Sequence, residues 1–509
     1  MFQRAPLLPS DQPRKQHWQQ LVLPLIALFA ITVATRIIFA GEIVRPGDSG
    51  NFTLAVEHFD IRLQQPQMPG MFILFIFFAR GFNLFLQDPH ASLVAVNIFA
   101  SGIAVVGLFL IGREWFNAKV GWTASLLTLT SPAVWHRSEV ALSHVIEFGW
   151  IVLIDFAAYK TGLGQRRYLM LLGLLMGLAG GIRPSTPFFL LPFVLFATVR
   201  GFRTKGYKVQ DVVAAVLIGL LGVAIWFVPL IQSAGGWSTY WAMIQAWLPL
   251  HTERQDADSL VKILDNFFLL FKALFRVVGI AILPILWMVL RPRSHWIKRL
   301  WPRQWSAQSI MLSILPGGLY FLLVHLRRKD QAFTIMPGFI LLASYSLVAL
   351  GERLQSRYRY ALVWVIGIAV GLNGLFFLLG PDELPTAREL RNYDIDYGSS
   401  IEYIRETFLP ETTAVLTHPY SRRLTEIYFP DYQEPQLSIR VSDQPMPLAP
   451  HVRTLVLLGS KVFRKPGQDD GFQTEIVSDH GTVVRYRTWD EGESLWITGR
   501  STELRPTQP

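Results

Sequence analysis

Long apolar stretches, separated by short charged connections, make up most of the chain. The stretches at 21–40 and 211–231 are typical, with few charged residues in either. A helix of about 20 such residues is long enough to cross the hydrocarbon core of a bilayer. The pattern therefore predicts an α-helical polytopic membrane protein.

The apolar pattern predicts about eleven spans, at residues 20–40, 91–112, 121–137, 140–159, 168–182, 184–199, 211–231, 265–290, 307–325, 332–350 and 360–379. One further apolar segment, 71–86, contains Arg80, Gly81 and Asn83. It is short for a span, so we expect a helix lying in the membrane interface.

Charged residues are distributed unevenly between alternate connections. If residues 1–19 form a cytoplasmic tail, the cytoplasmic connections carry most of the Lys and Arg, as at 200–208 and 291–303. The opposite connections carry acids, as at 42–60. This asymmetry matches the positive-inside rule, and counting 71–86 as a span would reverse every later connection. The net charge of +10 is attributed to these connections, and we expect no nucleic-acid binding.

The composition changes after residue 380. Residues 381–509 lack long apolar runs, and after eleven spans they lie outside the cytoplasm. We expect a small extracytoplasmic α/β domain here, following the membrane domain at 20–380. Its strands and helices are predicted at 412–416, 454–458, 400–408 and 421–428. The chain has no cysteines, which excludes disulfides and thiolate metal sites.

The first outer loop, residues 41–70, contains a concentration of ionisable side chains. Asp48 follows a Pro-Gly turn, and either Asp48 or Ser49 could cap a following helix. Glu57 and His58 come shortly after, before the turn at 68–70. Ionisable groups where a membrane cavity opens more often serve function than those on a soluble surface. Capping and chemistry are thus both open for Asp48.

The layout of this region resembles a known superfamily. A polytopic chain with an Asp in its first outer loop, a Pro-Gly turn some twenty residues on and an interfacial helix resembles the GT-C glycosyltransferases. It is similar more narrowly to the bacterial members grouped with protein O-mannosyltransferases and the aminoarabinose transferase of lipid A. Further motifs follow in order: Leu129-Thr130-Ser131-Pro132, Ala179-Gly180-Gly181-Ile182-Arg183-Pro184 and Asp330-Gln331-Ala332-Phe333-Thr334-Ile335-Met336-Pro337. The likeness covers about residues 20–350.

The resemblance implies an inverting glycosyltransferase. The donor would be a polyprenyl-phosphate-linked sugar, and the acceptor a lipid, glycan or protein at the outer face of a bacterial-type inner membrane. Asp48 would be the general base that deprotonates the acceptor hydroxyl. The chain departs from the superfamily where Asp48 is followed by Ser instead of a second acid, and where the turn reads Met-Pro-Gly. These departures leave the sub-family and the metal requirement open.

A leaving lipid phosphate needs cations, and candidates lie on the outer side. His325, Arg327, Arg328 and Lys329 form a cluster where the topology rule disfavours positive charge. An anionic lipid head group would explain the cluster, although ordinary anionic lipids or neighbouring acids would also do so. Arg183 is a second candidate for the phosphate, and its alternative role is to extend toward the interface from the membrane.

Two further substrate-binding candidates are Glu139, at the outer end of the third span, and His144, in the outer half of the fourth. His144 and Glu147 are three residues apart on one helix face. Ionisable residues inside a membrane are costly and seldom idle, and pairing between helices is their commoner use.

A divalent metal (Mg, Mn or Zn) is a further implication of the resemblance. Some relatives bind one between the first outer loop and a later one, so Glu57 or His58 with His251 is a candidate set. Imidazole and carboxylate together suit zinc or manganese.

Two rival functions remain. A transporter or flippase of a lipid-linked or anionic substrate would use the same cations, but we find no inverted repeat of the kind common in transporters. A non-catalytic scaffold would not need acids and cations on one face. The sequence therefore favours the glycosyltransferase.

Overall fold

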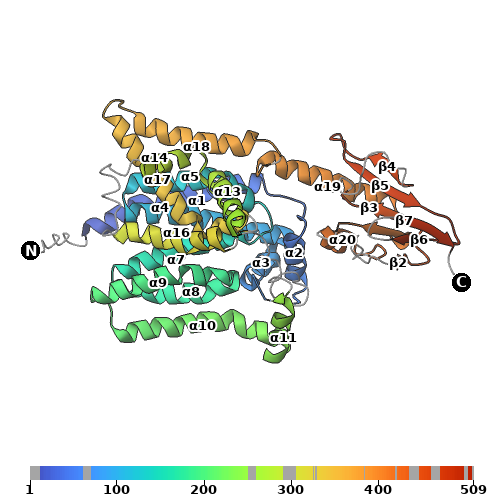
Figure 1. Cartoon of the computed structure of the whole chain (residues 1–509), viewed down its shortest axis with the longest axis horizontal. Helices are drawn as coiled ribbons and strands as arrows, with labels where there is room; N and C mark the ends of the chain where they lie inside the picture. Colours follow the sequence, from blue (N-terminus) through green and yellow to red (C-terminus); the bar gives the residue numbers. More distant parts are fainter. Residues whose placement is uncertain are drawn as a thin grey trace, which may run out of the picture.

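The computed structural model describes residues 12–60, 70–249, 259–290, 305–324, 326, 329–382, 384–418, 421–434, 446–459, 471–497 and 502–506. A bundle of helices forms the larger part, and a smaller domain with strands extends from one end of it (Figure 1). Helix α1 begins at the end of the bundle that is farther from this smaller domain.

The predicted spans are all helical. The bundle helices are α1 (Gln12–Ile38), α4 (Pro89–Trp115), α5 (Ala118–Thr130), α6 (Pro132–Ser138), α7 (His144–Gly162), α8 (Arg166–Ile182), α9 (Ser185–Arg203), α10 (Val209–Ser233), α13 (Ser259–Val278), η2 (Gly279–Ala281), α14 (Ile282–Leu290), α16 (Trp305–Leu323), η3 (Lys329–Ile335), α17 (Met336–Gln355) and α18 (Ala361–Leu379). Within the described ranges, eight segments are long and apolar enough to cross a membrane; α5, α7 and α8 are not among them. The figure of eleven spans stays a prediction.

The predicted span at 121–137 is two helices instead of one. Helix α5 ends at Thr130, and α6 begins at Pro132. Pro132 has no amide hydrogen to continue the α5 ladder, and Ser131 caps α6 by accepting from the Val134 amide. The break turns His136 and its neighbours toward the end of the bundle where the small domain lies.

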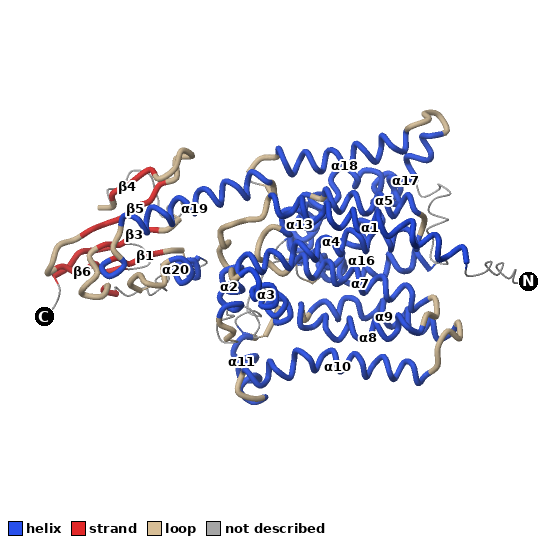
Figure 2. Tube along the Cα trace, turned by 180° about the vertical axis from the view of Figure 1, so that it is seen from behind, coloured by secondary structure: helices blue, strands red, loops and turns tan. Residues whose placement is uncertain are grey.

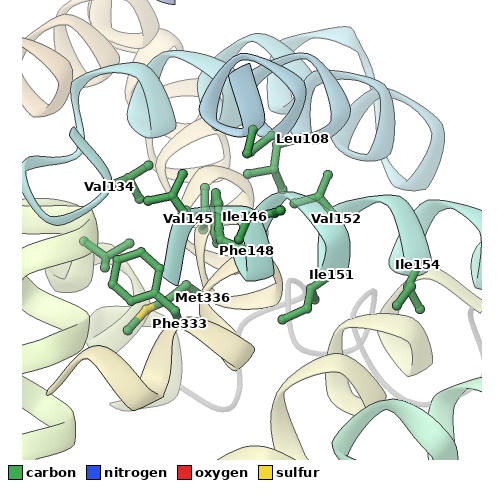
Figure 3. Packing of buried hydrophobic residues seen from close by; sticks show 14 of the residues in the cluster. Leu108, Val134, Val145, Ile146, Phe148, Ile151, Val152, Ile154, Phe333 and Met336 are labelled. Atoms are coloured by element: carbon green, nitrogen blue, oxygen red, sulfur yellow. The ribbon is translucent and has the colours of Figure 1, made fainter. Parts of the chain in front are cut away.

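The main hydrophobic core surrounds α7. Phe148, Ile151 and Val152 are fully buried, and Phe148 packs against Phe333 (Figure 3). Helix α10, in contrast, buries only 11% of its apolar window. A helix that is apolar all round packs inside a protein or faces lipid. Helix α7 is of the first kind and α10 of the second.

Short helices gather at the end of the bundle nearest the small domain. They are α2 (Asp48–Glu57), α3 (Ile73–Leu86) and α11 (Trp237–Trp247). Helix α3 matches the predicted interfacial helix at 71–86. Its 14 residues are too few to span a bilayer, and its Leu84 and Phe85 are exposed.

The C-terminal domain combines one long helix with two small sheets (Figure 2). Its elements are α19 (Ala387–Thr407), η4 (Pro410–Thr412), β1 (Thr413–Leu416), α20 (Arg422–Tyr428), β2 (Met446–Pro447), β3 (Thr454–Leu457), β4 (Gln473–Ile476), β5 (Val483–Thr488), β6 (Glu493–Ile497) and β7 (Thr502–Pro506). The sheets have strand orders β1-β3-β5-β4 and β2-β6-β7. Among the strands that the structure describes, β1 and β3 pair in parallel and the other pairs are antiparallel.

Both predicted strands and the helix at 421–428 are confirmed. The helix predicted at 400–408 is the second half of α19, which begins at Ala387. Thr386 caps it by accepting from the Glu389 amide. The correction matters because the missed first half of α19 carries the residues that contact the membrane domain.

Candidate active site

A cavity of about 380 Å³ lies where the first outer loop, the α6–α7 corner, α13 and the start of α19 meet. Asp48, His136, Arg137 and His144 line it together with Arg276. Its remaining lining residues are Arg45, Pro46, Val140, Leu142, Asp382, Leu384, Pro385 and Glu389. The structure thus brings the predicted Asp48 and His144 into one cavity.

Asp48 is the first residue of α2 and does not cap it. Gly47 occupies the cap position with a φ of +82°, a conformation that glycine adopts without strain. No side-chain cap bond is formed there, and Ser49 is buried. Within the described residues, no hydrogen bond or ion pair joins the Asp48 side chain. The first turn of α2 favours its negative charge through the exposed helix amides.

The cations of the cavity come from three elements. Arg45 belongs to the first loop, Arg137 to α6 and Arg276 to α13. The sequence analysis assigned no role to Arg276, which lies within the predicted span at 265–290. A charged side chain within an apolar segment is energetically costly and usually marks a functional position, so Arg276 could have been predicted from the sequence on this ground.

Arg276 also connects the cavity to an apolar groove. The groove, of about 390 Å³, lies between α13, η2 and α18 and is lined by Pro132, Phe275, Arg276, Gly279, Ile280, Leu372, Asn373, Leu375, Phe376, Leu379 and Gly380. A smaller hollow beside both is lined by Arg137 and Arg276, among others. A polar chamber and an apolar groove thus meet at one arginine.

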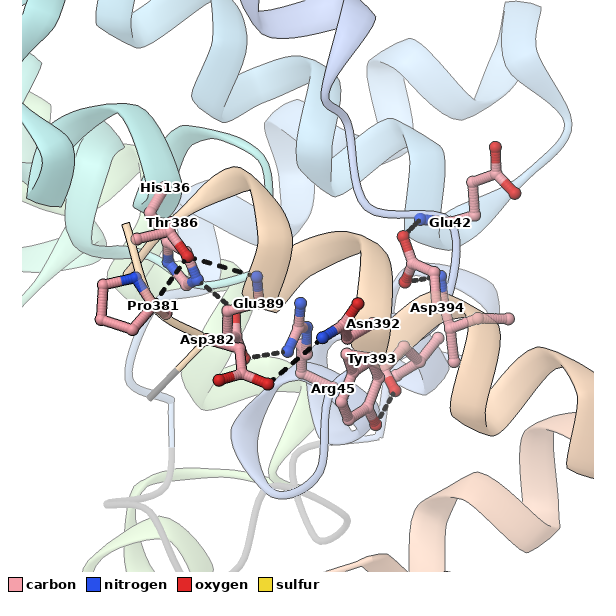
Figure 4. Close-up of polar contacts among 12 residues, drawn as sticks. Glu42, Arg45, His136, Pro381, Asp382, Thr386, Glu389, Asn392, Tyr393 and Asp394 are labelled. Atoms are coloured by element: carbon pink, nitrogen blue, oxygen red, sulfur yellow. Dashed lines mark hydrogen bonds and ion pairs between the residues drawn. The ribbon is translucent and has the colours of Figure 1, made fainter. Parts of the chain in front are cut away.

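Glu389, which the sequence analysis missed, joins two walls of the cavity. Its Oε1 accepts from Nη1 of Arg45 and its Oε2 from Nε2 of His136, both at 2.6 Å (Figure 4). Burial raises the pKa of this carboxyl, but the His136 hydrogen bond and the Arg45 charge outweigh burial and lower the pKa to about 2. Glu389 is therefore ionised at neutral pH.

Arg183 occupies a different place from the one expected. Its guanidinium donates to Glu147 at 2.7 Å, and the same carboxylate accepts from Thr186 at 2.8 Å and Thr334 at 3.0 Å. Glu147 is 1% exposed. Arg183 is absent from the lining of the cavity, so pairing between helices describes its contacts better than extension to the interface.

Glu139 is fully buried in the α6–α7 corner and does not line the cavity. Its carbonyl accepts from the Gly41 amide at 2.9 Å, which fixes the start of the first loop. Arg36 lies close enough to interact electrostatically with its carboxyl. A substrate-binding role for Glu139 stays a prediction.

The predicted cationic cluster is largely outside the described residues. His325, Arg327 and Arg328 are not described, and of Lys329 only the backbone is, at the start of η3. Further along η3, the Thr334 side chain contacts Glu147. Phosphate binding by this cluster stays a prediction.

Of the proposed metal ligands, the structure describes only Glu57 and His58. Glu57 and His58 lie 3.5 Å apart at the far end of α2 from Asp48, and both are exposed. His251 is outside the described residues. Nowhere in the described part of the chain do three or more His, Cys, Asp or Glu residues form a metal-binding group. These residues do not fit a metal site at the cavity, and a metal held with His251 stays a prediction.

The site and fold define a class: a polytopic helical membrane protein whose polar cavity lies at one end of the bundle, under an α/β domain. ArnT from Cupriavidus metallidurans has this fold. Its structures bound to undecaprenyl phosphate and in the apo state each cover 92% of this chain and 98% of their own, at 13% identity, with TM-scores of 0.52 and 0.53. This chain therefore shares the fold of ArnT, as the sequence resemblance implied.

A second neighbour is more distant. The Archaeoglobus fulgidus oligosaccharyltransferase, in complex with Zn and sulfate, covers 85% of this chain and 67% of its own, at 13% identity and a TM-score of 0.46. No family model matches the sequence, and no curated protein matches it either. The likeness thus defines the fold, and function must be argued from the site.

Proposed function

We propose that this protein is a glycosyltransferase that moves a sugar from a polyprenyl-phosphate-linked donor to a lipid, glycan or protein acceptor. The observation that carries the proposal is the single cavity shared by the Asp48 carboxylate and the cations Arg137 and Arg276. The neighbouring ArnT structure holds undecaprenyl phosphate, a donor lipid without its sugar. The transfer requires a base and a phosphate site close together, and this cavity contains groups suited to both.

Asp48 serves as the general base. Its carboxylate takes the proton of the acceptor hydroxyl while the hydroxyl oxygen attacks the anomeric carbon. The bond between that carbon and the phosphate oxygen breaks on the opposite face, so the configuration inverts. Asp48 suits this role because capping does not occupy its side chain.

Arg276 and Arg137 receive the leaving phosphate. Guanidinium groups match phosphate oxygens in geometry and charge, and they stabilise the negative charge that develops as the bond breaks. Because Arg276 also borders the apolar groove, the polyprenyl chain lies along α13 and α18 while its phosphate points into the cavity. These residues replace Arg183, which is engaged with Glu147. No step of this proposal uses a metal.

The cavity opens toward the C-terminal domain, which we place outside the cytoplasm. With the N-terminus cytoplasmic, Asp48 then lies at the outer face of a bacterial-type inner membrane. The charge asymmetry of the connections supports this orientation. The donor and acceptor would both reach the site from that face.

The test is transfer by purified protein in lipid nanodiscs, given polyprenyl-phosphate sugars and candidate lipid, glycan and protein acceptors. We expect Asp48→Asn to lower turnover by about a hundredfold or more, since it removes the base. Glu42→Gln is the matched control, because this exposed acid lies in the same loop and only its backbone is held. Arg276→Gln should raise the KM for the donor.

Asp48→Asn with wild-type turnover would refute the base assignment. Movement of a lipid head group across vesicles with no chemical change would favour the transporter instead. Inversion is read from the anomeric configuration of the product by NMR.

A further inference from the structure

Glu389 lies at the junction between the C-terminal domain and the catalytic loop. It belongs to the first turn of α19, where the Thr386 cap fixes its backbone. Its two carboxylate oxygens each bind one partner, Arg45 from the first loop and His136 from α6. The Arg45 guanidinium also stacks over the Tyr393 ring at 3.9 Å, one turn along α19. One helix thus sets the position of two separate walls of the cavity.

The loop that precedes Asp48 is attached to the same domain along its length. The Asp394 carboxylate accepts from the amides of Glu42 and Ile43 at 3.1 and 3.2 Å (Figure 4). The amide of Val44 donates to the Tyr428 hydroxyl at 2.8 Å, and its carbonyl accepts from the Tyr393 hydroxyl at 3.0 Å. The backbone of residues 42–44 is therefore held by side chains from α19 and α20 of the C-terminal domain.

The chain after Asp48 is held by α20. Nε of Arg423 donates to the Asn51 side chain at 3.0 Å, and both residues are buried. Gly50 packs so closely that a Cβ there would lie 2.7 Å from Cβ of Arg423. Asp48 therefore lies between two segments that the C-terminal domain fixes, while its own side chain lines the cavity.

We propose that Glu389 is a positioning residue for the catalytic loop: by binding Arg45 and His136 it fixes the Asp48 backbone against the α6 wall. The proposal rests on the function proposed above. Arg45 is three residues before Asp48, and displacement of a reacting group by about 1 Å can cost a hundredfold in rate. The domain thus contributes to turnover without supplying a reacting group.

The charge of Glu389 is what the test must remove. Glu389→Gln keeps the size of the side chain and one acceptor for Arg45, but places an amide against His136. We expect kcat to fall between about ten- and a hundredfold with a smaller change in the donor KM, because the groups that Glu389 binds, Arg45 and His136, are not the arginines assigned to the phosphate. Glu389→Asp, which keeps the charge, should recover part of kcat. Glu503→Gln, in an exposed pair with Arg505 on the same domain, is the matched control.

A second measurement does not depend on sugar transfer. Hydrogen–deuterium exchange in nanodiscs should show faster exchange of residues 41–51 in Glu389→Gln, with the β1 and β3 amides unchanged. Unchanged exchange of 41–51 would overturn the proposal, and so would faster exchange with wild-type kcat. If the wild type transfers no sugar from any donor, the proposed function fails, while the exchange result still decides whether Glu389 fixes the loop.

Discussion

Glu147 and Glu389 are two carboxylates that each bind an arginine, in two very different regions of the protein. Glu147 lies inside the helix bundle with 1% of its surface exposed, and it binds Arg183 at the end of α8, Thr186 in α9 and Thr334 in η3. Glu389 lies at the rim of the cavity, 29% exposed, and joins the C-terminal domain to the first loop and α6.

This difference in exposure gives the two carboxylates different roles: Glu147 stabilises the bundle, and Glu389 attaches one domain to the other. Loss of one partner of a buried ion pair strongly destabilises the folded protein, because the remaining charge has neither a counter-charge nor water around it. At the rim, the Glu389 carboxyl is 29% exposed and protons can reach it, although its partner Arg45 is 12% exposed and so no more accessible than Arg183 at 13%. Glu147 is therefore a structural centre of the bundle, and Glu389 is a reversible attachment between domains.

The largest expected effect comes from Glu147→Gln. It removes the buried counter-charge of Arg183, whose own side chain is 13% exposed, so we expect a loss of about 3 kcal/mol in unfolding free energy, the low end for a broken buried pair. Thermal unfolding in detergent, followed by tryptophan fluorescence, would measure it. The double variant Glu147→Leu with Arg183→Met removes both charges and should cost less. If the single variant is as stable as the wild type, Glu147 is not the structural centre described above.

Acid pH should act on Glu389. The pKa of Glu389 is lowered from 4.5 to about 2, so its contribution to docking is complete above about pH 4.5 and is lost as the pH falls toward 2. The groups facing it are Arg45, His136 and, through His136, Arg137. Exchange of residues 41–51 measured between pH 5 and 2.5 should accelerate over that window.

In Glu389→Gln the part of the acid-dependent change that comes from this carboxyl should be absent. The part that remains belongs to other groups, among them His136, whose pKa burial lowers to about 4. An equal response of wild type and variant would assign the whole transition to those other groups.

The smallest expected effect is that of Tyr428→Phe. It removes the acceptor of the Val44 amide, a loss of about 1–3 kcal/mol at a part-buried donor. We expect faster exchange at Val44 only, with no change in melting of the bundle. Tyr358→Phe, at an exposed position in the α17–α18 connection, is the control. If protection from exchange is lost at the Val44 amide alone, the docking contacts act independently of one another.

The sequence predicted the helices well because apolar runs determine them directly. The break at Ser131 was missed, although Pro132 was visible, because apolar residues continue on both sides. Arg276 was missed for a related reason: within an apolar segment, nothing local distinguishes a cavity-facing arginine from one that extends to the interface.

The role of Glu389 could not be predicted locally, because its partners are 344 and 253 positions away. Such pairs exist only after the domain has docked. Asp48 was a candidate because an acid in the first outer loop, ahead of a Pro-Gly turn and an interfacial helix, resembles the GT-C layout, and its role as the base stays a prediction. Its contribution to the cavity, next to Arg137 and Arg276, required the fold.

The contacts of α19 and α20 with residues 42–51 have a consequence for engineering. If the C-terminal domain were replaced by that of a relative, the first loop would no longer fit it. A different residue at 423 would lose the packing against Gly50 and the hydrogen bond to Asn51. The exchanged domain should therefore dock only when residues 41–51 and 381–509 are transplanted together, although hundreds of residues separate them in the sequence.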